Sequence, residues 1–274
     1  MDKKKNPERK KSEMDKRGIL MVSFGTSHLD TMAKTIEVLE KEVAEQYPEN
    51  PVYRAFTSQM VLTKLKEQGL EFDNMEQALL RMKEDGIREL VVQPTHIIAG
   101  IEYEKMLEQL KMHRLEFSEI RVGRPLMDQA GDYKEAVEAV LAEERDTIGS
   151  KDTALLLMGH GTSHRATAVY PTLEYTFHLM GYSNVYVGTV EGYPELEDLE
   201  KRLREKPYKK VCLRPFLLVA GDHAKNDMAG EKESWKNYFE EKGYEVETKI
   251  RGLGECEGIR RMFYQHLKEA TELE

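Results

Sequence analysis

Two histidines and one glutamate in the second half of the chain have the chemistry needed to hold a divalent metal ion. His160, Glu191 and His223 each follow a short apolar run of strand length. Imidazole nitrogens suit borderline cations such as cobalt, nickel, iron and zinc, and a carboxylate beside them can add a ligand or accept protons as a general base. Two histidines with one carboxylate also leave coordination positions open. We therefore predict that all three bind the metal and that His160 and Glu191 are catalytic.

Each of the three residues also has a purely structural explanation. His160 lies between two glycines and could belong to a tight turn, and Glu191 could be a solvated loop carboxylate. His223 follows Asp222, which could cap a helix. Only their joint position after three strands favours a common site, because such strand ends face one crevice. On the residues alone, both explanations stay open.

Apolar runs and helical spacing alternate along the chain. Strands are predicted at 18–24, 52–56, 89–94, 120–122, 154–158, 185–190, 211–219 and 245–250, and helices at 30–47, 62–68, 74–84, 101–113, 133–145, 170–180, 196–205, 230–242 and 258–272. This alternation predicts an α/β fold with doubly wound parallel sheets. Ligands in such folds bind outside the carboxyl ends of the strands.

The order of elements and several residues repeat, which predicts an internal duplication. The motif 25–28 (Gly-Thr-Ser-His) matches 161–164, and 93–100 matches 214–221. Aligning the halves sets His160 against Phe24, His223 against Glu102, and Glu191 roughly against Ser58. The second half has thus acquired two imidazoles and a carboxylate at three strand ends.

The duplication predicts two similar α/β domains, 18–128 and 129–274, with a cleft between them. The second domain would carry the metal site, and its final helix, about 258–272, could pack back on the first. Residues 1–17, rich in lysine and arginine, are predicted to form a disordered basic tail.

Composition narrows the classes of partner. The net charge is −9, which argues against nucleic acid. The sequence shows neither an apolar run of about 20 residues nor a secretory h-region, so we expect no membrane span and a cytoplasmic protein. Cys212 and Cys256 have no metal-ligand spacing. The sequence does not fix the oligomeric state, and a homo-oligomer is kept as an alternative.

Several longer motifs resemble those of the anaerobic sirohydrochlorin cobaltochelatases, which belong to the class II chelatases and need no ATP. These motifs are 22–27, 54–58, 96–98 with 102–105, 158–161, 190–195, 218–224 with 226–228, and 234–235 with 252–255. The resemblance covers about residues 18–268. It implies a two-domain chelatase fold, similar to protoporphyrin ferrochelatase, with the tetrapyrrole in the cleft. In that family the two metal-binding histidines match His160 and His223, and the acidic partner matches Glu191.

The implied activity is a lyase reaction, the ATP-independent insertion of Co²⁺ into sirohydrochlorin or precorrin-2 during cobalamin biosynthesis. No cofactor beyond the substrate metal ion is expected. Sirohydrochlorin carries many carboxylates, so the cleft needs donors. The predicted substrate-binding residues are Ser23, Gly25, Thr26, Ser27, Arg54, His96, Glu102, Gly161, Thr162 and Lys225. Among them, the two Gly-Thr-Ser motifs would act at helix N-termini, and the arginine and lysine as carboxylate partners.

The other histidines are less informative. His96 could line the cleft or assist metal entry, or it could be a buried, hydrogen-bonded histidine. His28 and His164 are expected on the surface or on helices.

Three alternative functions remain. The same chemistry could use iron or nickel, because ligand type alone does not separate these metals. The protein could carry a tetrapyrrole or metal without turnover, and such a carrier would need no proton acceptor at Glu191. A two-lobed binding protein of the periplasmic type is disfavoured by the absence of a signal segment.

Overall fold

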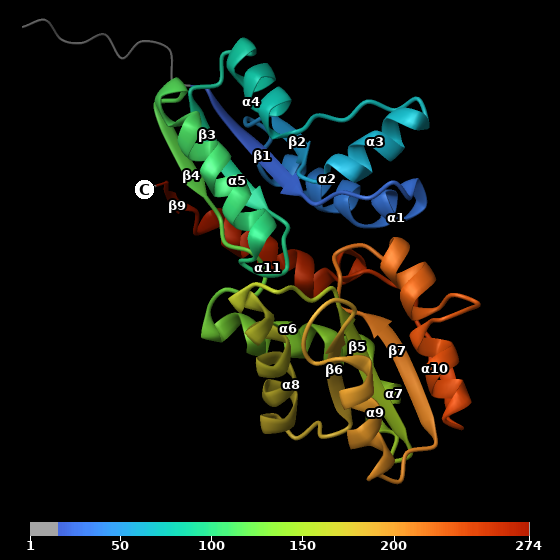
Figure 1. Cartoon of the computed structure of the whole chain (residues 1–274). Coiled ribbons are helices and arrows are strands. Elements are labelled where there is room, and N and C mark those ends of the chain that lie inside the picture. Colours follow the sequence, from blue (N-terminus) through green and yellow to red (C-terminus); the bar gives the residue numbers. More distant parts are fainter. Residues whose placement is uncertain (1–15, 274) are drawn as a thin grey trace, which may run out of the picture.

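The computed structural model describes residues 16–273, which form two α/β lobes (Figure 1). Residues 1–15 of the predicted basic tail lie outside the described part. The first strand begins at Arg17, one residue earlier than expected. The two lobes correspond to the two halves of the sequence, apart from the chain end.

The first lobe is built around a mostly parallel sheet. Its elements are β1 (Arg17–Ser23), α1 (Leu29–Lys34), α2 (Ile36–Gln46), β2 (Val52–Phe56), α3 (Gln59–Glu67), α4 (Met75–Glu84), β3 (Glu89–Pro94), α5 (Ile101–Met112), η1 (Arg114–Glu116) and β4 (Glu119–Val122). The strand order is β2-β1-β3-β4, and the two-residue strand β9 pairs antiparallel with β4 at the edge.

The second lobe repeats this order. Its elements are α6 (Ala130–Glu143), α7 (Arg145–Gly149), β5 (Thr153–Gly159), η2 (Arg165–Ala168), α8 (Val169–Leu179), β6 (Val185–Thr189), α9 (Leu196–Arg204), β7 (Lys210–Pro215), the π-helix η3 (His223–Met228), α10 (Trp235–Glu241), β8 (Glu245–Thr248) and η4 (Leu253–Glu255). The chain then returns through α11 (Glu257–Lys268) to β9 (Thr271–Glu272) in the first sheet. The second sheet has the order β6-β5-β7-β8 and is parallel throughout.

The strand registers of the two sheets match residue by residue. Val22 of β1 lies opposite Pro94 of β3, and Met158 of β5 lies opposite Pro215 of β7. Ser23 faces Phe56, as Gly159 faces Thr189. These registers make Phe24 equivalent to His160 and Ser58 equivalent to Glu191. The α/β class, the parallel sheets and the duplication are confirmed.

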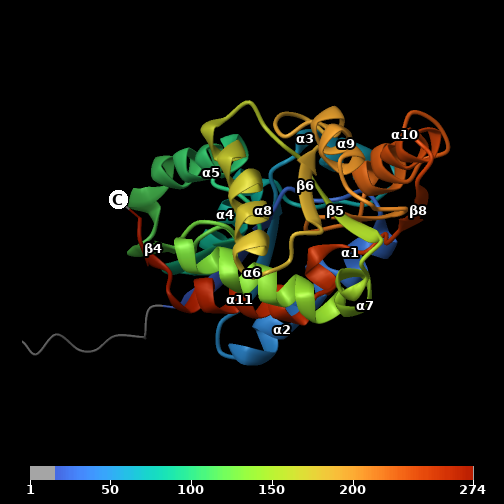
Figure 2. The same ribbon diagram turned by 90° about the horizontal axis from the view of Figure 1, so that it is seen from below.

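One apolar core runs through both lobes. Ile19 and Met21 of β1 belong to the same buried cluster as Leu155 and Leu157 of β5, connected through residues of α6 and α11. Seen from below, α6 and α11 lie side by side across the joint (Figure 2). The lobes therefore share apolar packing at their base.

The start of α6 is fixed by a buried carboxylate. Asp132 accepts hydrogen bonds from the backbone N–H groups of Asp128, at 2.9 Å, and Gln129, at 2.6 Å. It also lies 3.3 Å from Nε2 of His266 on α11. Burial alone would raise the pKa of Asp132, but these hydrogen bonds lower it to about 2. The carboxylate thus stays charged and ties the linker between the lobes to the final helix.

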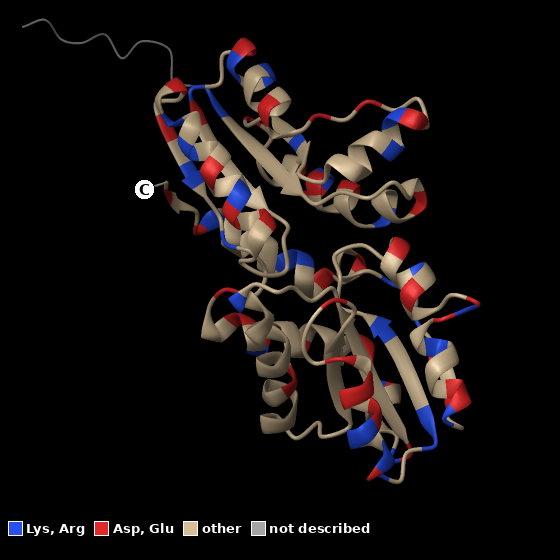
Figure 3. Cartoon of the chain, in the orientation of Figure 1, with Lys and Arg blue, Asp and Glu red and all other residues tan. Residues whose placement is uncertain are grey.

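Some elements differ from the prediction. The helix expected at 30–47 is interrupted at Thr35, whose hydroxyl donates to Thr31 O at 2.6 Å. The helix expected from Gly230 begins only at Trp235, and neither η3 nor β9 was predicted. Lys and Arg are interspersed with Asp and Glu over both lobes (Figure 3). No helix within residues 16–273 has the length and apolarity to cross a membrane.

Candidate metal site

His160 and His223 lie side by side at one edge of the second sheet. His160 follows β5 directly, and His223 opens η3, after β7. Their strands are parallel neighbours, so their carboxyl ends meet at the same edge. The imidazole centroids are 4.7 Å apart and the rings are nearly perpendicular, at 88°. Metal–nitrogen distances of about 2.0–2.1 Å put two rings that share an ion about 4.5–5.5 Å apart, so this spacing suits one shared cation.

The hydrogen bonds of the two rings determine which nitrogen each can offer. Nδ1 of His160 lies 2.9 Å from the carbonyl oxygen of Gly161, which can only accept. Nδ1 of His223 lies 2.6 Å from Oδ2 of Asp227. In both rings Nδ1 is therefore the donor, and the neutral imidazole keeps the Nε2 lone pair for a metal.

The turn that presents His160 depends on a glycine and a buried tyrosine. Gly161 has a φ of +84°, a left-handed conformation that other residues disfavour. Its amide donates to the hydroxyl of Tyr170 at 3.2 Å. Burial raises the pKa of Tyr170, so the hydroxyl keeps its proton. This support was not predictable from the sequence, where Tyr170 indicates only the start of a helix.

Glu191 is tied to His160 by its backbone, but its side chain is not grouped with the imidazoles. Its amide donates to the carbonyl of His160 at 2.7 Å. Its side chain is exposed, and within the described chain no three His, Cys, Asp or Glu side chains converge on a metal position. The three predicted ligands are therefore not grouped in the described residues: the histidines are paired, the Glu191 side chain is exposed, and metal binding by Glu191 stays a prediction.

Two predicted substrate-binding residues are already engaged inside the first lobe. Arg54 donates to Glu40 through Nε at 2.8 Å and also through Nη2. Ser23 is fully buried and accepts a hydrogen bond from Thr95 at 2.8 Å. Both side chains therefore already have partners inside the first lobe, and their contacts with substrate stay predictions. Strand-end position alone did not reveal these partners, which lie elsewhere in the chain.

Lys225 and Glu102 form ion pairs that are more exposed than those of Arg54. Lys225 reaches Asp30 at 3.2 Å, and Glu102 accepts from Lys105 at 2.8 Å. Such partly exposed pairs contribute about 0–1 kcal/mol each, so a substrate carboxylate could replace Asp30 on Lys225. Their substrate roles stay predictions.

The two Gly-Thr-Ser turns are built alike. The hydroxyl of Thr26 accepts from the amide of His28 at 3.2 Å, and that of Thr162 accepts from the amide of His164 at 3.1 Å. Gly25 shares the positive φ of its counterpart, at +95°. The short helices α1 and η2 follow. The equivalent geometry supports duplication, whereas the expected contacts of Gly25, Thr26, Ser27, Gly161 and Thr162 with substrate stay predictions.

The side chains of His28 and His164 each contact the opposite lobe, although the sequence suggested only surface or helix positions. Nε2 of His28 lies 2.8 Å from Asp222, whose other oxygen accepts from Lys64 at 2.9 Å. Hydrogen bonds from Lys64 and His28 lower the pKa of Asp222. His164 lies 3.2 Å from Glu104. Asp222, the residue before His223, is thus bound by the first lobe. In the sequence, only the repeated positions of His28 and His164 could have suggested such contacts between the lobes.

The side chain of His96 is partly buried. Both of its ring nitrogens are buried without a hydrogen-bond partner among residues 16–273. Burial lowers its pKa to about 4, and its ring packs edge-on against Tyr103, with centroids 6.4 Å apart. Among the described residues the ring has no hydrogen-bond partner, and a role in the cleft stays a prediction.

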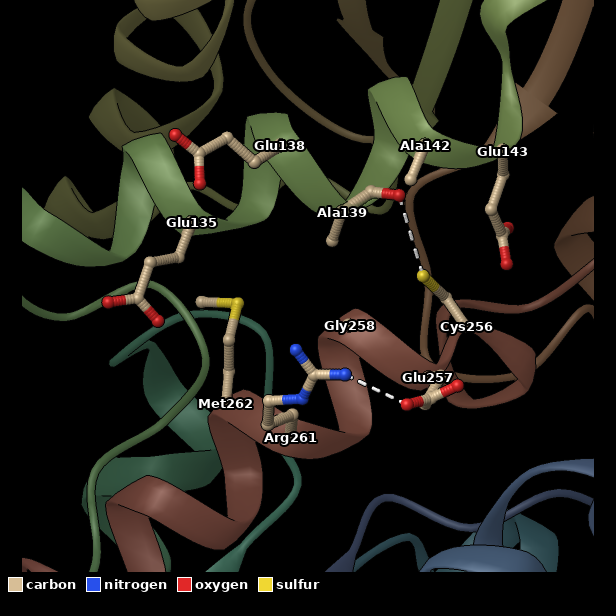
Figure 4. A pocket seen from close by; sticks show the side chains of 10 residues that line it. All are labelled: Glu135, Glu138, Ala139, Ala142, Glu143, Cys256, Glu257, Gly258, Arg261 and Met262. Carbon is tan, nitrogen blue, oxygen red and sulfur yellow. Dashed lines mark hydrogen bonds and ion pairs between the residues drawn. The ribbon is translucent and has the colours of Figure 1, made fainter.

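A cavity of about 660 Å³ lies elsewhere, between α6 and α11 (Figure 4). Glutamates of α6, together with Glu257 and Arg261 of α11, line it, and the thiol of Cys256 donates to Ala139 O at 3.6 Å. It contains none of the predicted site residues. This cavity is therefore separate from the predicted metal site.

Comparison with known proteins assigns the chain to a family. The sequence model of the family described as "Cobalt chelatase (CbiK)" matches residues 17–272. The chain belongs to this family. A sirohydrochlorin cobaltochelatase of Salmonella typhimurium is 37% identical over 260 residues, covering 94% of this chain and 97% of that protein. The sirohydrochlorin cobaltochelatase CbiKC of Nitratidesulfovibrio vulgaris is 33% identical over 262 residues, covering 94% of this chain and 92% of that protein.

Solved structures support the chelatase fold. SirB from Bacillus subtilis with Fe³⁺ has a TM-score of 0.65 at 15% identity, covering 93% of this chain and 95% of that one. The sirohydrochlorin chelatase SirB from Bacillus subtilis subspecies spizizenii in complex with cobalt has a TM-score of 0.64, also at 15% identity, and the coverage is 93% and 94%. The family and fold that the motifs of this cobalt chelatase implied are both confirmed.

Proposed function

We propose that the protein inserts Co²⁺ into sirohydrochlorin, or its reduced relative precorrin-2, without ATP, as a step of cobalamin biosynthesis. The observation that carries the proposal is the pair of imidazoles, with centroids 4.7 Å apart and both Nδ1 atoms engaged as donors. The relatives at 37% and 33% identity are named sirohydrochlorin cobaltochelatases. Site and family point to the same chemistry.

In this account the two Nε2 atoms hold the incoming cobalt ion. Two neutral ligands leave its charge uncompensated, and the remaining positions stay open to ring nitrogens. Ring nitrogens then replace protein ligands one at a time. The ion acidifies the pyrrole N–H groups that it begins to bind, by the logic that acidifies metal-bound water.

Glu191 is the proposed proton acceptor. Its backbone hydrogen bond to His160 keeps it beside the metal position, and its exposed carboxylate carries no competing partner among the described residues. Two pyrrole protons must leave during insertion, and a carboxylate at this place can take them to solvent.

The substrate ring needs apolar contacts as well as donors. Phe24 follows β1 with 46% of its surface exposed, and Tyr193 follows β6 with 60% exposed. Exposed aromatic side chains at strand ends suit the flat face of a tetrapyrrole. Binding energy from the ring periphery would favour its bending toward the transition state.

The test is a metal panel. Initial rates of insertion of Co²⁺, Fe²⁺ and Ni²⁺ into sirohydrochlorin are followed by absorbance for wild type, His160→Ala and His223→Ala. His113→Ala, at the end of α5, is the matched control. We expect cobalt to be a good substrate, both site variants to lose insertion, and the control to retain it. Cobalt rates equal to those without protein would refute the proposal.

Glu191→Gln separates the enzyme from a carrier. If the protein is an enzyme, this variant still binds sirohydrochlorin but loses insertion. If the protein is a carrier, wild type binds the ring and the metal with no turnover, and Glu191→Gln changes nothing.

A further inference from the structure

The carboxylate of Asp227 has no role in the scheme so far, yet it makes the shortest contact at the metal site. Its Oδ2 lies 2.6 Å from Nδ1 of His223. Charge-assisted hydrogen bonds of this length are the stronger ones in proteins. We propose that Asp227 is a positioning residue that fixes the tautomer and the ring orientation of His223, an inference that rests on the proposed function.

The local backbone explains why these two residues meet. His223 and Asp227 are the first and fifth residues of the π-helix η3. Side chains four residues apart lie on one face of a helical turn. Single π-helical turns occur often at functional sites. The turn therefore places a carboxylate behind the imidazole, on the side away from Nε2.

The two imidazoles are held by different means. The Nδ1 of His160 donates to a backbone carbonyl in the rigid Gly161 turn. The ring of His223 is 35% exposed, and its Nδ1 has a side-chain acceptor instead. A third of the His223 side chain is open to solvent, and the carboxylate adds a directional restraint to the packing against His160.

The base of the turn is anchored separately. Asp222 is bound by His28 and Lys64 of the first lobe. This contact restrains the backbone ahead of His223 but does not touch the ring. Loss of Asp227 should therefore free the imidazole without unfolding the turn.

Loss of Asp227 should weaken binding of the metal more than binding of the tetrapyrrole. A carboxylate that accepts from Nδ1 keeps the proton off Nε2 and makes Nε2 a better donor to a cation. Loss of such a partner costs about 10–100-fold in metal affinity or activity. We expect this loss in cobalt affinity and in the rate of insertion at limiting cobalt. The KM for sirohydrochlorin should stay within about twofold of wild type.

The experiment compares Asp227→Asn and Asp227→Ala with Asn226→Ala, an exposed neighbour on the same turn. Cobalt affinity is measured at one fixed pH, and ¹⁵N NMR of metal-free protein reports the tautomer of His223. In wild type we expect a single species protonated at Nδ1. In Asp227→Ala we expect a mixture of tautomers and the loss of affinity, and in Asn226→Ala no change. Asp227→Asn keeps the shape and an acceptor oxygen, so its loss should be smaller.

The two readouts keep this inference separate from the proposed function. Failure of cobalt insertion by wild type would refute the function, but the metal-free tautomer measurement would still test Asp227. An unchanged tautomer in Asp227→Ala, or cobalt affinity within about twofold of wild type in a folded variant, would overturn the positioning role. If the alanine variant fails to fold, Asp227→Leu, which keeps a similar volume but removes the acceptor, decides by the same two measurements.

Discussion

Replacing Gly161 by alanine tests whether the loop carrying Glu191 is seated on the end of β5. A Cβ at this position would lie 2.0 Å from the carbonyl oxygen of Glu191 and 2.8 Å from Cβ of Thr189. Carbon–oxygen contacts in proteins lie at about 3.3 Å or more. The loop must therefore retreat by about 1 Å. That movement weakens the 2.7 Å hydrogen bond from Glu191 to His160.

The cost can be worked out by parts. A residue other than glycine at a φ of +84° costs about 1–2 kcal/mol. Overpacking against backbone adds about 1–3 kcal/mol, and a weakened hydrogen bond adds up to about 1 kcal/mol. We expect Gly161→Ala to lower the free energy of unfolding by about 3–5 kcal/mol.

Gly181→Ala is the matched control, because Gly181 has a φ of +94° but no atom within 4 Å of the added Cβ. It carries the backbone cost alone, about 1–2 kcal/mol. Urea unfolding of both variants gives the difference, which we expect to be about 1–4 kcal/mol, because the backbone cost is shared. The rate of cobalt insertion per folded molecule should fall only for Gly161→Ala. Equal destabilisation of the two variants, with insertion intact, would refute the description of this loop.

Three further predictions concern the joint and the core. The pKa of Asp132 is lowered from 3.8 to about 2, so its contribution to stability is complete above pH 4 and is lost as the pH falls from about 4 to about 2. The free energies of unfolding of wild type and Asp132→Asn should therefore differ by about 2 kcal/mol above pH 4 and converge as the pH approaches about 2. Glu104→Gln breaks a largely exposed contact with His164 and should cost less than about 1 kcal/mol in stability, measured by urea unfolding at low salt. Cys212 and Cys256 are buried and burial raises the pKa of both thiols, so a thiol reagent should modify neither before the protein unfolds; rapid native labelling would contradict their packing.

The strands and helices with a regular spacing of apolar residues were predictable from the sequence. Apolar strands ending in glycine and the repeated Gly-Thr-Ser-His motif gave the α/β class, the duplication and the equivalence of Phe24 with His160, which the registers confirm. Strand β9 has only two residues, too few to show an alternation of apolar and polar side chains. The π-helix η3 was not predicted because Gly221 and Asp222 suggested only a helix cap.

The site was predictable only in part, because the types of residue do not determine their partners. The pairing of His160 with His223 followed from neighbouring strand ends. The guanidinium of Arg54 was expected in the cleft, but a glutamate on α2 binds it. Such pairing depends on which helix packs over a strand end. For the same reason the hydrogen bond from the Gly161 amide to the Tyr170 hydroxyl, beneath the His160 turn, left no trace in the sequence.

The central claim is that His160 and His223 bind one cobalt ion together. X-ray absorption at the cobalt edge, on the Co²⁺ complex without tetrapyrrole, counts the imidazoles bound to the ion. The account predicts two imidazole nitrogens in wild type and one in each of His160→Ala and His223→Ala. A shell made only of oxygen ligands in wild type, unchanged in both variants, would contradict it.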